Sequence, residues 1–123
     1  MDRYKDLVAG FKKHINENTE VECCGIITKN FEYIPCDNLS PVPSESFVLD
    51  PRALFKYGED CWGIFHSHTA YHDVLPSDHD KNSAIFKQYK FIVGSPKEEY
   101  YLYWLDDLNY LRFKPLEESD LQC

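Results

Sequence analysis

The stretch that most constrains the fold is an apolar run that ends in two histidines, residues 61–68. Its sequence, Cys-Trp-Gly-Ile-Phe-His-Ser-His, is typical of a buried central strand. Because side chains alternate along a strand, His66 and His68 should point to one face and Ser67 to the other. The carboxylate of Asp80 follows twelve positions after His68, at an expected helix start. Two imidazoles and one carboxylate suit a catalytic zinc site that leaves a fourth position for water.

A hydrolytic zinc site also needs a general base, and Glu22 is the best candidate in the sequence. It lies in the apolar segment Val21–Thr28, where an unpaired carboxylate would be costly. Beside a cation the same carboxylate would be held ionised, while burial would raise its proton affinity. A glutamate exposed at the end of a strand is the structural alternative.

Ser77 and Asp80 form a Ser-x-x-Asp pattern, which predicts a capping box at the start of a helix. Capping alone would explain both residues. The two roles are compatible, because Ser77 can cap the helix while Asp80 points at a metal. The Ser77 hydroxyl could also donate a hydrogen bond to the oxyanion of a tetrahedral intermediate.

Hydrophobic periodicity and turn residues predict an α/β domain with one mixed sheet and flanking helices. Residues 1–123 should form a single domain, with the acidic segment 117–123 a frayed tail. Helices are expected at 2–17, 51–57 and 78–88, and strands at 21–28, 31–35, 46–49, 61–65, 91–93, 99–105 and 110–113.

Charge and composition exclude several partners. The formal net charge of −8 and the lack of a basic cluster argue against nucleic acid. No apolar run approaches the length of a membrane span and no signal peptide is evident, so a soluble, cytoplasmic protein is expected. Five cysteines, an odd number without a C-x-x-C pair, are expected to be mostly buried free thiols.

Taken together, Glu22, His66-Ser67-His68 and Ser77-x-x-Asp80 resemble the JAMM motif of the MPN+ metallopeptidases. The likeness covers roughly residues 20–105. Segments 35–38 and 45–51 resemble the prokaryotic branch, especially the JAMM domain of tailed-phage tail-assembly proteins. The resemblance implies the MPN fold, with a cytidine-deaminase-like layout.

By that resemblance His66, His68 and Asp80 bind Zn²⁺, Glu22 activates the metal-bound water, and Ser77 assists the oxyanion. The sequence departs from the motif in two places. The spacer between His68 and Ser77 holds eight residues, one more than usual, and Thr69 stands where the family commonly has proline. If the extra residue does not bulge out, the third ligand moves to His79, and His72 is a further competitor.

The predicted function is hydrolysis of an amide bond, as a peptidase or isopeptidase, in an extended peptide tail. Substrates of the family imply a ubiquitin-like C-terminus or a phage tail-assembly protein, with a cell-wall peptidase or tail protein as a separate partner. A phage protein would act in the host cytoplasm or the virion tail. Tyr71 and His72, in the lengthened loop 69–76, are expected to line one wall of the substrate groove.

Two other functions remain open. A non-catalytic MPN-like scaffold in tail assembly would use the same fold as a binding module. A binuclear phosphoesterase would need further ligands, which the sequence offers between positions 72 and 79. Metal stoichiometry separates the phosphoesterase from the JAMM peptidase, since the JAMM site takes one zinc per chain and the phosphoesterase takes two.

Overall fold

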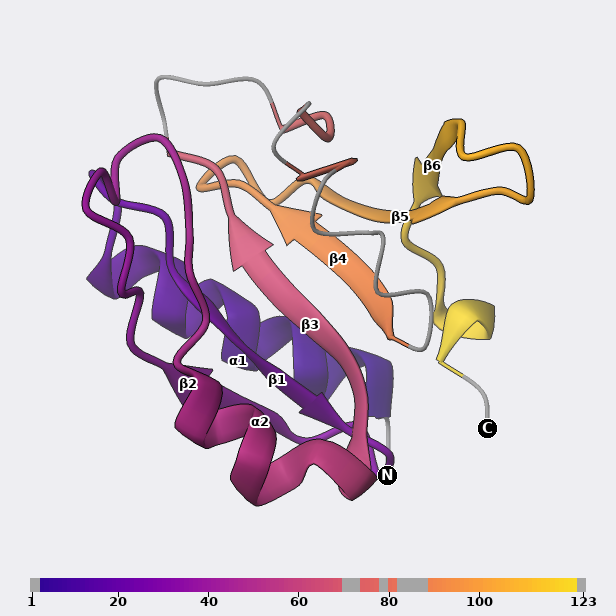
Figure 1. The fold of residues 1–123 in the computed structure, drawn as a ribbon, viewed down its shortest axis with the longest axis horizontal. Coiled ribbons are helices and arrows are strands. Elements are labelled where there is room, and N and C mark those ends of the chain that lie inside the picture. The colour runs from indigo at the N-terminus through magenta and orange to yellow at the C-terminus, as the bar shows by residue number, and fades with distance from the viewer. Residues whose placement is uncertain (1–2, 70–73, 78–79, 82–88, 122–123) are drawn as a thin grey trace.

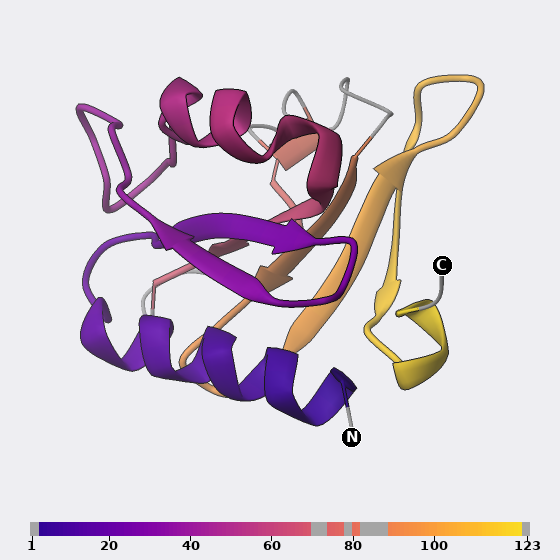
Figure 2. The same cartoon turned by 90° about the horizontal axis from the view of Figure 1, so that it is seen from below.

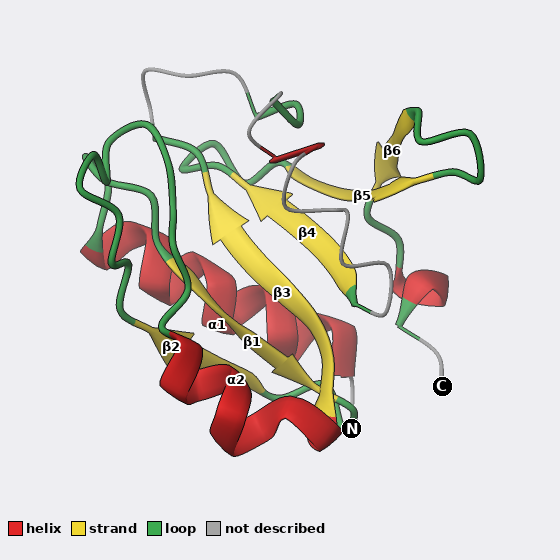
Figure 3. Cartoon of the chain, viewed as in Figure 1, coloured by secondary structure: helices red, strands yellow, loops and turns green. Residues whose placement is uncertain are grey.

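A computed structural model describes residues 3–69, 74–77, 80–81 and 89–121 (Figure 1). Within these ranges six strands form one sheet in the order β2-β1-β3-β4-β5-β6. Helices α1 and α2 flank the sheet, so the predicted α/β class with a single mixed sheet is confirmed (Figure 3). The bounds are α1 Arg3–Glu17, β1 Cys24–Thr28, β2 Tyr33–Cys36, α2 Pro51–Tyr57, η1 Gly58–Asp60, β3 Cys61–Ser67, β4 Lys90–Gly94, β5 Tyr100–Leu105, β6 Leu111–Pro115 and η2 Glu118–Asp120.

The two α-helices lie on opposite faces of the sheet (Figure 2). Helix α1 buries Leu7, Phe11 and Ile15, which recur every fourth residue and therefore share one face of the helix. Helix α2 begins at Pro51, and the Asp50 side chain accepts a hydrogen bond from a backbone N–H of its first turn. Both helices were predicted from these sequence signals. None of the described helices combines the length and apolar character needed to cross a membrane.

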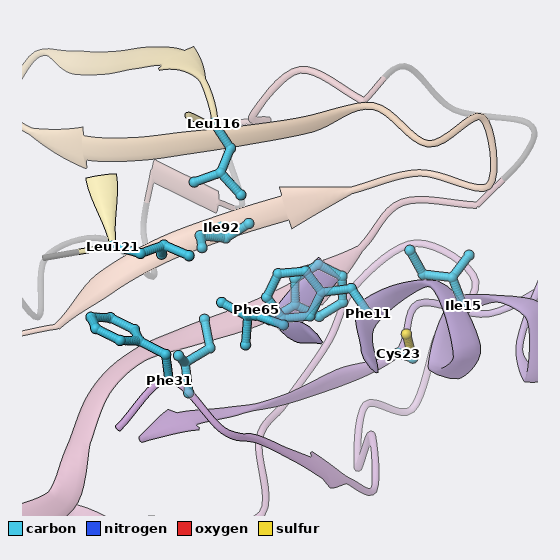
Figure 4. Close-up of a cluster of buried hydrophobic side chains, with 10 residues drawn as sticks. Phe11, Ile15, Cys23, Phe31, Phe65, Ile92, Leu116 and Leu121 are labelled. Carbon is cyan, nitrogen blue, oxygen red and sulfur yellow. The ribbon is translucent and has the colours of Figure 1, made fainter. Parts of the chain in front are cut away.

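The core beneath α1 is built around stacked aromatic rings (Figure 4). Phe11 of α1 stacks on Phe65 of β3 with ring centroids 3.9 Å apart, and Tyr33 meets both rings edge-on. Ile92 of β4 completes the centre of this layer. Burial of these side chains anchors α1 on the middle of the sheet, and each contributes about 1.5–3 kcal/mol.

A second core covers the opposite face and includes Ile64 and Tyr103. Alternation along the strands separates the two layers, since Ile64 faces this core and its neighbour Phe65 faces α1. The adjacent Cys23 and Cys24 likewise enter opposite cores, and both are free thiols. The prediction of buried, unpaired cysteines is confirmed for these two.

Strand β3 is the structural centre because it pairs antiparallel with β1 and parallel with β4. Gly63 allows the parallel pair to approach closely, since a Cβ there would lie 2.6 Å from the carbonyl oxygen of Lys90. Two parallel neighbours require a crossover connection. Strand β4 therefore starts at the end of the sheet opposite to the end of β3. Ser77 and Asp80 belong to the connecting segment, and Asp80 lies beside the histidines at the C-terminal end of β3.

Each of the three strands predicted before residue 50 differs from the structure, whereas the four later ones agree to within two residues at each end. The first begins at Cys24 and not at Val21, and the second begins at Tyr33 because Phe31 is a turn residue with φ 62°. The predicted strand 46–49 is wrong, because this segment forms only an isolated bridge between Asn38 and Leu49. Hydrogen bonds between the Asn38 side chain and the backbone of Ser46 and Val48 fix the 38–48 loop, and no ladder of strand pairing is formed within these described residues.

The expectation of a frayed tail is wrong for residues 117–121. Leu116 and Leu121 are buried in the core beneath α1, and Lys114 forms a salt bridge to Asp120 of η2. Little in the sequence indicates this packing, because residues 117–120 are polar or acidic and Leu121 is the one apolar residue among 117–121. Most of the predicted helix 78–88 lies outside the described residues, although Asp80 and Lys81 are helical.

Candidate metal centre

The two histidines are held at the end of β3 by the residue between them. Ser67 points toward β1, where its Oγ accepts a hydrogen bond from the Cys23 N–H at 2.9 Å. The Ser67 N–H donates to the Cys23 carbonyl, also at 2.9 Å. His68 continues the pairing with β4, because its N–H donates to the Gly94 carbonyl at 2.8 Å. His66 and His68 therefore face away from Ser67, as strand alternation predicts.

His66 is completely buried. The Phe47 ring stacks on its imidazole with centroids 4.3 Å apart and planes 16° from parallel. Phe47 reaches this position from the loop that was predicted as a strand. A loop held over the sheet thus provides the apolar cover of the first histidine.

Asp80 contacts both imidazoles. Its Oδ1 lies 3.2 Å from His66 Nε2, and its Oδ2 lies 3.0 Å from His68 Nε2. The Ser77 N–H donates to Asp80 Oδ2 at 2.9 Å, and the Asp80 N–H donates to Ser77 Oγ at 3.2 Å. This is the predicted capping box, and it leaves the carboxylate turned toward the histidines. Ser77 and Asp80 therefore cap the helix while the Asp80 carboxylate contacts the two histidines.

The pKa of the Asp80 carboxyl reflects opposing effects. Burial raises it, whereas the charge of His66, the hydrogen bond and charge of His68, and the Ser77 N–H lower it. The lowering contributions prevail, so the carboxylate form is favoured despite an exposed fraction of 1%. An ionised carboxylate between two imidazoles is suited to hold a cation.

Glu22 reaches the cluster from the segment just before β1. Its exposed fraction is 4%, so the alternative of an exposed glutamate at a strand end is wrong. Its Oε1 lies 3.5 Å from His66 Nδ1. Both flanking backbone groups are fixed, because the Glu22 N–H donates to the Pro43 carbonyl at 2.7 Å and Asn38 Nδ2 donates to the Glu22 carbonyl at 2.8 Å. The carboxylate is therefore carried on a rigid backbone.

Asn38 is a site-supporting residue that sequence reasoning missed. Besides holding Glu22, its Oδ1 accepts hydrogen bonds from the N–H groups of Ser40 and Val48 at 2.9 and 3.0 Å. An asparagine two residues before a serine, within a loop rich in proline and serine, is the signal that could have found it. Asn38 joins the 38–48 loop to the backbone of the glutamate.

Tyr103 of β5 was also missed, and nothing in the sequence separates it from the other eight tyrosines. Its hydroxyl lies 2.9 Å from His66 Nε2, and the side chain is fully buried. Burial raises the pKa of Tyr103 well above its ordinary value, and the charges of Asp80 and Glu22 raise it further. The phenol therefore stays protonated beside the histidine.

Two buried atoms of the cluster have the chemistry to hold a metal ion. Glu22 Oε1 and His66 Nδ1 are buried and have no hydrogen-bond partner among the described residues. Buried polar atoms are normally satisfied, so these two suit a bound ion or a water. Ligand atoms of Glu22, His66 and His68 all lie within 4.8 Å of one another. The buried cluster can therefore bind a metal ion.

Three candidates cannot be placed. Tyr71 and His72, predicted to line the substrate groove, lie outside the described residues, and so does the alternative ligand His79. Ser77 is described and exposed, with its Oγ engaged by the Asp80 N–H. The intact Ser-x-x-Asp pattern delivers Asp80 to the histidines despite the longer spacer.

Comparison with known proteins adds the family. Residues 5–106 match the family model of prokaryotic homologs of the JAB domain. The matched range includes Glu22, both histidines and Asp80, and it confirms the predicted JAMM-type family. A search of curated proteins finds no match. The chain belongs to the prokaryotic JAB-domain family.

Proposed function

We propose that the protein is a zinc-dependent peptidase or isopeptidase that hydrolyses an amide bond in an extended peptide tail. The observation that carries this proposal is the convergence of Glu22, His66, His68 and Asp80 in one buried cluster. A scaffold protein of the same fold would have no need to bury two carboxylates beside two imidazoles, because such groups are costly without a ligand. Membership of the JAB-domain family supports the same chemistry.

In this proposal His66, His68 and Asp80 would hold the metal. Zinc bound by such ligands acts as a Lewis acid and lowers the pKa of water to about 7. Glu22 then has the role of general base, since its Oε1 is the unpaired carboxylate oxygen of the cluster. The proton that Glu22 accepts would pass to the leaving amine.

Ser77 and the loop before it would face the substrate. Ser77 is exposed, so its hydroxyl can turn to donate a hydrogen bond to the developing oxyanion. Tyr71 and His72 would line the groove that receives the tail. A flexible ubiquitin-like C-terminus or a phage tail-assembly segment suits such a groove, because an extended chain exposes its amide bonds to a site at the end of a strand.

Elemental analysis tests the metal. Protein purified without added metal should contain one zinc per chain, and His68→Ala should lose it. His14→Ala is the matched control, since His14 lies on α1 and contacts Tyr33 on the other face of the sheet. Two metals per chain would favour the phosphoesterase, and none would contradict the proposal.

Turnover tests the chemistry. Fusions of a ubiquitin-like domain with a flexible C-terminal tail should be cleaved by the wild type, and matched fusions without the tail should not. Glu22→Gln should keep zinc and lose about 10²–10⁴-fold in rate. A zinc-loaded wild type that cleaves no tailed fusion would favour the non-catalytic scaffold.

A further inference from the structure

Tyr103 lies on β5, between β4 and β6, and points its hydroxyl at the metal centre. It pairs with Phe91 of β4 and Phe113 of β6, so its backbone is held on both sides. The Tyr103 ring packs against Phe91 with centroids 5.5 Å apart and meets the His66 ring edge-on at 5.9 Å. The hydroxyl is 2.9 Å from His66 Nε2. A rigid strand therefore presents a single polar group to one edge of this imidazole.

The orientation of the His66 ring is not determined by its other packing contacts. Phe47 stacks on its face, and a stacked ring can turn by half a rotation about its Cβ–Cγ bond without losing that contact. Such a turn exchanges Nε2 for a C–H group and moves Nδ1 away from Glu22. Polar contacts at the ring edge distinguish the two orientations, and Nε2 has two of them, Tyr103 and Asp80.

Of these two contacts, the one to Tyr103 is the more independent. Asp80 divides its carboxylate among His66, His68 and the Ser77 N–H. The Tyr103 hydroxyl, by contrast, contacts the His66 nitrogen from a strand that carries none of the proposed ligands. The hydroxyl shares Nε2 with Asp80 and does not contact the opposite ring nitrogen, so it can set the ring orientation before a metal binds. Hydrogen-bonding partners of a metal-binding histidine commonly set its tautomer and ring orientation.

We propose that Tyr103 is a positioning residue for the metal centre: its hydroxyl selects the His66 orientation in which Nε2 faces Asp80 and Nδ1 faces Glu22. The metal-binding consequence rests on the proposed function, whereas the ring orientation can be measured without any metal. Removing the hydroxyl should release the ring to populate both orientations, and the histidine would then be poorly placed as a ligand.

The test compares Tyr103→Phe with Tyr33→Phe. Tyr33 is a matched control, because its hydroxyl also lies at hydrogen-bond distance from a histidine, 2.6 Å from His14 Nδ1, but on the other face of the sheet. Zinc affinity, measured by competition with a chromogenic chelator, should fall about two-fold or more in Tyr103→Phe, because a ring that populates both orientations equally is competent in half of the molecules. It should be unchanged in Tyr33→Phe. Equal affinity in Tyr103→Phe and wild type would overturn the proposal.

A second measurement uses metal-free protein. Nitrogen NMR of the His66 ring should show one set of signals in wild type and altered or duplicated signals in Tyr103→Phe. Unchanged ring signals would overturn the positioning role. If the wild type binds no zinc, the proposed function fails, and the ring signals still decide the role of Tyr103.

Packing is separated from hydrogen bonding by Phe91→Leu. This variant disturbs the Tyr103 ring contact and keeps the hydroxyl. It should lower the melting temperature and leave zinc affinity close to wild type. A loss of affinity as large as that of Tyr103→Phe would show that packing, and not the hydroxyl, supports the site, which would overturn the proposal.

Discussion

Replacing Glu22 by glutamine should stabilise the metal-free protein while removing its activity. Glu22 Oε1 and His66 Nδ1 face each other at 3.5 Å, and neither has a hydrogen-bond partner in the described part of the chain. With the His66 proton on Nε2, where Asp80 and Tyr103 can accept it, Nδ1 is an acceptor and cannot pair with the carboxylate oxygen. The glutamine amide of the Glu22→Gln variant has the same shape and can donate an N–H to Nδ1 after the two atoms approach by about 0.5 Å.

The size of this effect follows from the buried atoms. A buried polar group without a partner costs about 1–3 kcal/mol, and one new hydrogen bond would satisfy both. The tautomer that it requires, with the proton on Nε2, is compatible with Asp80 Oδ1 at 3.2 Å and the Tyr103 oxygen at 2.9 Å as acceptors. The free energy of unfolding should therefore rise by about 1–3 kcal/mol, which corresponds to about 4–12 °C in melting temperature for a domain of this size.

Urea unfolding of chelator-treated protein measures this change. Glu20→Gln is the matched control, because Glu20 is exposed and its substitution should stay within about 0.5 kcal/mol of wild type. A Glu22→Gln variant that is no more stable than this control, or less stable than wild type, would refute the reasoning. Such a result would mean that the two atoms already have partners in solution.

Three further predictions concern the surroundings of the site. Asn38→Ala should lower turnover and destabilise the protein by about 1–3 kcal/mol, because the Asn38 side chain forms hydrogen bonds with the backbone of Glu22, Ser40 and Val48. Urea unfolding and the tailed-fusion assay measure these changes, and unchanged turnover would contradict the prediction. Gly63→Ala should cost about 1–3 kcal/mol or more, because the added methyl would lie 2.6 Å from the Lys90 carbonyl oxygen; a variant as stable as wild type would show that β4 shifts freely. Burial raises the pKa of Cys23 and Cys61 to about 11, so only about one thiol in 10³ is ionised at pH 8. Both cysteines should therefore react slowly with a disulfide reagent until urea unfolds the protein, and rapid labelling of either cysteine in the native protein would refute this.

Local sequence signals were sufficient for most of the elements. The apolar spacing in residues 3–17 and the Asp50-Pro51 cap identified both α-helices, and the apolar run ending at His66 identified the central strand. The segment 46–49 misled because its apolar residues pack onto the sheet from a loop. Its place is set by side-chain hydrogen bonds of Asn38, which a pattern of hydrophobicity does not contain.

The sequence by itself determined the ligand types and the pairing of the two histidines, because His66 and His68 are two positions apart on one strand and must share a face. It could not determine which distant groups join them. Glu22 lies 44 positions before His66, and Tyr103 lies 37 positions after it. Only the tertiary structure brings them together, since β1 and β5 reach the site through pairing across the sheet, and the crossover between the parallel strands β3 and β4 returns Asp80 to the end of β3. Side chains from four separate segments meet there because the sheet order, which no local pattern encodes, places their backbones around one strand end.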